Sequence, residues 1–94
     1  MTGRQIGKLR ARLDLDAFAF AAVLGVHVSS IYRWEANPLK PRIDPLQVQL
    51  LELLQGWIDR VPSSAADVKS TITNGLIQGG TLYALRALLD LMLA

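Results

Sequence analysis

The sequence predicts an all-α protein, a compact domain of five to six helices whose last two form a leucine-rich pair. Apolar residues recur at intervals of three and four along most of the chain, as they do on one face of an α-helix. Glycine, proline and capping residues stand between these periodic segments. Hydrophobic residues make up 51% of a 94-residue chain without cysteine, so a single core can form without disulfides.

Several classes of function find no support in the sequence. The chain has no cysteine and one histidine, His27, which cannot assemble a typical zinc site. There is no catalytic triad pattern and no phosphate-binding glycine loop, so we expect neither an enzyme nor a cofactor or metal site. The N-terminus lacks the apolar core of a signal peptide, and the apolar segment 82–94 is short and carries Arg86 and Asp90. We therefore expect a soluble, cytoplasmic protein without membrane contact.

Charge is distributed unevenly along the chain. Residues 1–42 contain seven basic and three acidic side chains, a balance of +4, whereas the remainder carries −2. A basic half is typical of a protein that meets a polyanion, although a difference of this size is also found on ordinary solvated surfaces. The charge pattern is therefore suggestive and needs support from the elements themselves.

The first helix is expected at about residues 4–13, where Ile6, Leu9 and Leu13 form an apolar stripe. Beside it, Lys8 and Arg12 continue a basic stripe that begins at Arg4. Such a stripe can line a phosphate backbone, or it can be a solvated helix face.

Two short helices follow, separated by a glycine. Asp16 can cap the second helix and Gly25 ends it, and a third helix can begin near His27 or Val28. With Ile31 as the buried reference, helical geometry places Trp34 and Glu35 near the inner side of the third helix. The outer side then carries polar and small residues: Ser29, Tyr32, Arg33 and Ala36. A short helix, a turn with glycine and a second helix with a polar face form the helix-turn-helix pattern.

At this point the sequence resembles a known family. The run "LRARLDLDAFAFAAVLGVHVSSIYRWEANPLKPR", residues 9–42, is similar to the Cro/C1-type helix-turn-helix domains of the Xre family, which includes the lambdoid phage repressors and Cro proteins. The likeness is carried by "LR" at 9–10, "FA" at 20–21, "LGV" at 24–26, "IYRWE" at 31–35 and the basic loop that follows.

The resemblance implies a transcriptional regulator, most simply a repressor, that binds double-stranded DNA as a dimer. Residues 28–36 would be the recognition helix, and the DNA contacts carried over from the family pattern fall on Val28, Ser29, Ser30, Tyr32, Arg33, Lys40 and Arg42. Arg33 and Tyr32 are the strongest candidates for base contacts, whereas Lys40 and Arg42 would hold the backbone. Ala17 stands where the family often has a glutamine that contacts a phosphate, and Lys8 and Arg12 on the first helix could compensate. His27, which replaces the usual Ser or Thr, is expected to act as a local cap or as a partly exposed spacer.

From Asp44 onward the chain becomes richer in leucine. Asp44 and Pro45 open a fourth helix, "RVPSS" at 60–64 ends it, and Gly79 and Gly80 break the chain again. The last helix places five apolar residues on one face: Leu82, Leu85, Leu88, Leu89 and Met92. We expect these residues to form a homodimer interface, the alternative being that they complete the core of the monomer.

These segments divide the chain into a helix-turn-helix domain, residues 1–60, and a C-terminal helical extension, residues 61–94. Two functions remain open. The first is a DNA-binding regulator, and the second is an antitoxin-like or phage-type adaptor whose C-terminal half binds another protein.

Overall fold

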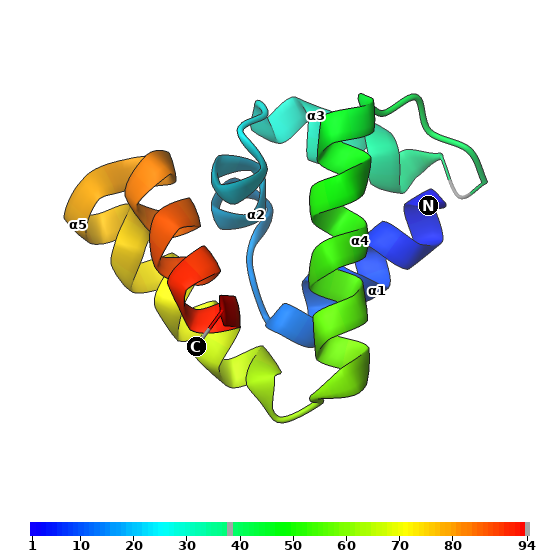
Figure 1. The fold of residues 1–94 in the computed structure, drawn as a ribbon. Coiled ribbons are helices and arrows are strands. Elements are labelled where there is room, and N and C mark those ends of the chain that lie inside the picture. Colours follow the sequence, from blue (N-terminus) through cyan, green and yellow to red (C-terminus); the bar gives the residue numbers. More distant parts are fainter. Residues whose placement is uncertain (38, 94) are drawn as a thin grey trace.

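The computed structural model describes residues 1–37 and 39–93, and it consists of five helices with no strand in that part of the chain. In chain order these are α1 (Gly3–Leu13), α2 (Ala17–Leu24), α3 (Val28–Ala36), α4 (Pro45–Arg60) and α5 (Ser64–Leu93). The all-α class expected from the sequence is confirmed, as a compact domain of five helices (Figure 1). Pro38 of the basic loop and Ala94 of the C-terminal extension lie outside the described residues.

The N-terminal helix begins and ends with defined caps. Thr2 and Gln5 form a capping box, in which the Thr2 hydroxyl accepts from the Gln5 amide and the Gln5 side chain accepts from the Thr2 amide. At the other end Asp14 adopts a left-handed conformation with φ 53°, which lets its amide bond back into the last turn. The expected stripe of Ile6, Leu9 and Leu13 is buried. The helix begins at Gly3, one residue before the start expected from the sequence.

The fourth helix begins at Pro45, as the sequence predicts, with Asp44 at the N-cap position. The Asp44 carboxylate makes no capping hydrogen bond. The start of the helix therefore depends on Pro45, whose fixed φ suits the first helical position. Ser64 is the first residue of α5, and its hydroxyl donates to the carbonyl of Val61 at 2.6 Å.

Helix α5 is folded back on itself at Gly80. This residue has φ 80° and ψ −163°, values outside the helical region, so α5 consists of a first arm, 64–79, and a second arm, 81–93 (Figure 1). The arms approach closely because Gly75 has no side chain: a Cβ atom there would lie 2.6 Å from the Cα atom of Ala84. By length and composition α5 is the one described helix that could cross a membrane, but neither arm alone reaches the roughly 20 residues that a span needs.

All five helices share one hydrophobic core. Each contributes at least one side chain with no exposed surface: Ile6, Phe20, Ile31, Leu51 and Ile72. From α5, the first arm adds Val68 and the second arm adds Leu88, which is 4% exposed. The C-terminal extension therefore packs into the same core as the first three helices, and α3 lies on the rim of this core, where its outer face is open.

Candidate nucleic-acid interface

Helices α2 and α3 are held by local caps and meet at a sharp bend. The Asp16 carboxylate accepts a hydrogen bond from the amide of Ala19 at 2.8 Å, and Gly25 ends α2 with φ 72°. Three residues after the end of α2, His27 Nδ1 caps α3 by accepting from the amide of Ser29 at 3.1 Å. The bend between the two helices is 107°. The expected capping roles of Asp16, Gly25 and His27 are all confirmed.

The two sides of α3 have opposite characters. Ile31 and Trp34 are buried in the core, as the sequence predicts, whereas Ser29, Tyr32 and Arg33 are exposed. Tyr32 keeps 57% of its surface open to solvent. The outer face of α3 therefore offers a hydroxyl, a phenol and a guanidinium to an external partner.

Val28 and Ser30 are placed less openly than the family pattern suggests. Both are half-buried, and Val28 packs against the hydrophobic core. Both lie in the first turn of α3, directly after the 107° bend between α2 and α3. Val28 therefore has less free surface for a base contact than its expected role would use.

A groove between α3, the following loop and the start of α4 brings two of the expected cations together. Arg33 from α3 and Arg42 from the loop line it with Ser30, and Asp44 adds one carboxylate. Two arginines against one aspartate leave the groove with a net positive charge. Lys40 is exposed in the same loop, where its carbonyl accepts from the Asn37 side chain at 3.2 Å.

The groove also has polar atoms that sequence reasoning missed. The Trp34 Nε1 atom and the Gln47 Oε1 atom are buried and have no hydrogen-bond partner among the described residues, and both residues line the groove. They leave an unused donor and an unused acceptor in its walls. The sequence places Trp34 on the inner side of its helix, but no local signal places Gln47 of α4 beside it.

The basic stripe of α1 does not act as one unit. Lys8 is exposed, but Arg12 forms an ion pair with Asp59 of α4, with 2.7 Å between Nη1 and Oδ1. Arg12 also lies beside Pro62 and Ser63, in the connection between α4 and α5. In Figure 1 this connection and α3 lie at opposite ends of α4. The structure therefore keeps Arg12 away from the groove that contains Arg33.

An ion pair behind the groove fixes α3 against α1. Arg10 donates two hydrogen bonds to the Glu35 carboxylate, at 2.8 and 2.9 Å, in the bidentate arrangement that arginine favours. The hydrogen bond to Glu35 is the main cause that raises the pKa of Arg10 above its ordinary value, against a smaller opposing effect of burial. Glu35, which the sequence places near the inner side of this helix, is thus held by Arg10 of α1.

Comparisons of the chain with models of known protein families, with curated proteins and with solved structures found no match. No group of three or more His, Asp or Glu side chains that could hold a metal occurs within residues 1–37 and 39–93.

Proposed function

We propose that this protein is a sequence-specific double-stranded DNA-binding transcriptional regulator, a dimeric repressor with residues 28–36 as its recognition helix. The observation that carries the proposal is the pair of short helices, α2 and α3, bent by 107° across a break that contains Gly25. Helix-turn-helix motifs join their helices at about 90–120° and place the second helix in the major groove. The exposed outer face of α3 supports this placement.

In this proposal, each exposed side chain of α3 makes a different contact with DNA. Arg33 donates two parallel hydrogen bonds to a guanine, because the guanidinium fork matches the O6 and N7 acceptors. Ser29 serves a base edge as donor or acceptor, and Tyr32 meets a thymine methyl group with its ring or a phosphate with its hydroxyl. Val28 makes an apolar contact with the part of its surface that remains open.

Phosphate contacts come from the loop and from the walls of the groove. Arg42 and Lys40 bind the backbone on the α4 side of α3, and Ser30 reaches a phosphate or a base edge. On α1, Lys8 remains as a backbone contact, whereas the ion pair with Asp59 withdraws Arg12 from this role.

The proposal is tested by duplex binding. A preferred duplex is first selected from a random pool, and affinities are then measured by fluorescence anisotropy over a range of salt concentrations. Arg33→Ala should weaken binding to the preferred duplex by about 1–3 kcal/mol and relax specificity at one base pair. Lys40→Ala should weaken all duplexes alike and lower the salt slope by about one.

Arg86→Ala is the matched control, since Arg86 is exposed on the second arm of α5 and should leave DNA affinity unchanged. If Arg33→Ala binds the preferred duplex as tightly as wild type, the recognition-helix assignment is wrong. If no duplex is bound more tightly than random DNA, the proposed regulator itself is contradicted.

A protein-interaction adaptor remains the second candidate. The exposed apolar side chains on α4 and α5, such as Leu46 at 63% and Leu82 at 82%, favour it because they suit a protein partner. This function predicts no preference among duplexes, so the selection experiment separates the two candidates.

A further inference from the structure

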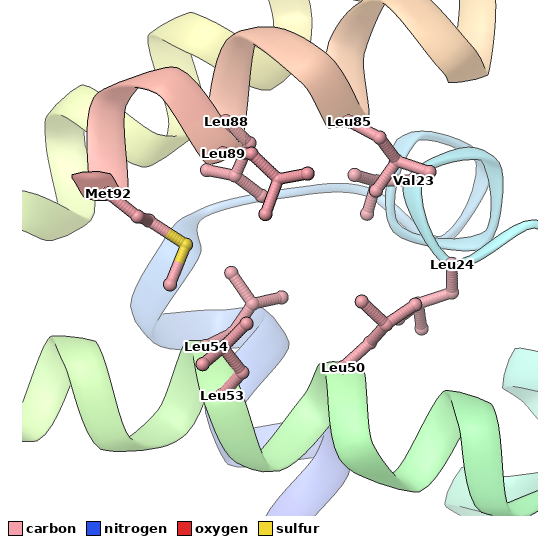
Figure 2. A pocket seen from close by; sticks show the side chains of 9 residues that line it. All are labelled: Val23, Leu24, Leu50, Leu53, Leu54, Leu85, Leu88, Leu89 and Met92. Atoms are coloured by element: carbon pink, nitrogen blue, oxygen red, sulfur yellow. The ribbon is translucent and has the colours of Figure 1, made fainter. Parts of the chain in front are cut away.

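An apolar cleft of about 120 Å³ opens between α2, α4 and the second arm of α5 (Figure 2). Every side chain that lines it is aliphatic or a thioether, so the cleft offers neither hydrogen bonds nor charge. Val23 of α2, Leu54 of α4 and Leu88 of α5 are buried side chains of this lining. The cleft is thus an opening into the core of the molecule.

Two half-exposed leucines stand at this cleft on different helices. Leu53 of α4 is 45% exposed and Leu89 of α5 is 47% exposed, and Figure 2 shows them on opposite sides of the opening. Leu53 is followed in the chain by Leu54, and Leu89 is preceded by Leu88. Both of these neighbours are buried leucines of the cleft lining. The same face therefore has projecting leucines and an apolar hollow between them.

The apolar surface continues beyond the cleft along both helices. Leu46 lies two turns before Leu53 on α4 and is 63% exposed. Leu93 lies one turn after Leu89 on α5 and is 84% exposed. Isolated exposed leucines are ordinary on a protein surface, but leucines at helical spacing on two adjacent helices form a continuous patch of the kind that marks an interface.

We propose that this face is a two-fold interface with a second copy of the chain, in which Leu53 of each copy packs into the cleft of the other and Leu89 packs against the rim of the partner's cleft. A two-fold interface joins one surface to itself, so it needs projecting groups and a hollow on the same face. This face has both. Because the lining carries no charge, packing of Leu53 into the partner's cleft brings no like charges together inside it.

The size of the cleft fits a side chain. A cavity of roughly 150 Å³ takes up one benzene ring, so about 120 Å³ has room for a leucine side chain and is too small for a helix. The second copy is favoured over a free apolar molecule because only a protein surface also covers Leu46 and Leu93.

This interface differs from the one expected from the sequence. Leu85, Leu89 and Met92 do line the cleft, but Leu88 is almost fully buried in its own chain and Leu82 is not part of the lining. The part of this interface that was not expected from the sequence comes from α4. The inference builds on the proposed dimeric regulator and names its partner surface, and its test uses no DNA.

The test is the oligomeric state, measured by sedimentation equilibrium from low to high micromolar concentration. Wild type should dimerise, and Leu53→Glu should raise the dissociation constant by about 30-fold or more, as expected for a central interface residue. Ile77→Glu is the matched control, because Ile77 is 79% exposed on α5 and lies outside the cleft. It should dimerise like wild type. Leu89→Glu, on the other side of the cleft, should behave like Leu53→Glu.

Circular dichroism establishes whether each variant is folded. If Leu53→Glu is not folded, Leu89→Glu takes its place as the test of the interface. A wild-type chain that stays monomeric at high micromolar concentration overturns the inference. Equal dimerisation of the cleft variants and wild type overturns it too, as does a loss of dimer in Ile77→Glu. A dimer sensitive to Leu53→Glu that prefers no duplex supports the interface and contradicts the proposed DNA-binding function.

Discussion

At the scale of single residues, Arg10 links the helix that contains Arg33 to two other segments of the chain. Its guanidinium binds both oxygens of Glu35 and also donates to the carbonyl of Leu15 at 3.2 Å. One side chain thus joins the end of α1, the turn before α2 and the helix that contains Arg33. Glu35 follows the buried Trp34, so the ion pair and the indole together set the rotation of α3 about its axis.

Substitution of this pair should reduce stability and DNA binding together. In a double-mutant cycle of Arg10→Ala and Glu35→Ala, we expect a coupling energy of about 1 kcal/mol in urea unfolding, since the pair is bidentate and partly buried. Each variant should also bind the preferred duplex more weakly, although neither side chain faces it. The more exposed pair of Arg12 and Asp59 is the control and should give a smaller coupling energy. Equal coupling in the two cycles would show that burial adds nothing to the Arg10 pair.

At the scale of elements, the hairpin of α5 depends on the close approach at Gly75. A Cβ atom at this position would meet the backbone of Ala84, which cannot move without separating the arms. We expect Gly75→Ala to lower the free energy of unfolding by about 1–3 kcal/mol, as overpacking does in a core. Gly56→Ala in α4 is the control, because a Cβ atom there meets nothing within 4 Å. Because alanine has a higher helix propensity than glycine, Gly56→Ala should stabilise the protein by about 0.5–1 kcal/mol.

Both variants are measured by urea unfolding at the lowest workable concentration, followed by far-ultraviolet circular dichroism. Opposite signs are the expected result. If Gly75→Ala stabilises the protein as Gly56→Ala does, the two arms do not pack as closely as the structure places them.

The elements themselves could be predicted from the sequence because their limits are set by local chemistry. Asp16 and Gly25 bound α2, His27 caps α3, and Pro45 starts α4, each through its own side chain or backbone preference. The break near Gly80 was predicted for the same reason. These signals act over three or four residues, which a sequence displays directly.

The contacts between helices could not be predicted in the same way. The ion pair of Arg12 with Asp59 links residues 47 positions apart, and no periodicity indicates which acidic residue of α4 will face α1. The leucines of the last helix show the same limit. Their stripe was visible, but Leu88 is buried in the chain's own core and Leu89 is half exposed, a division that depends on where α4 lies.

At the scale of the whole molecule, two ion pairs attach α1 to the C-terminal helices. Asp59 of α4 accepts from Arg12, and Asp14 at the end of α1 accepts from Lys69 of α5, 55 positions away. These contacts lower the pKa of both carboxyl groups below the ordinary value of 3.8, chiefly through the hydrogen bonds from Arg12 and Lys69. Their protonation should therefore weaken the attachment of α1 to the rest of the fold.

The direction of the pH dependence follows from these shifts. A carboxyl group whose pKa is lower in the folded chain than in the unfolded chain stabilises the fold in its ionised form. This stabilisation is fully present above the unfolded pKa, about 3.9, and is lost as the pH falls through the folded value. We therefore expect the urea midpoint of unfolding to fall below about pH 4. The double variant Asp14→Asn and Asp59→Asn should start from a lower midpoint and lose less of it over the same acidic range, because it lacks the groups that titrate. An equal loss in variant and wild type would mean that other carboxyl groups dominate the acid response and that these two ion pairs contribute little to holding α1 in place.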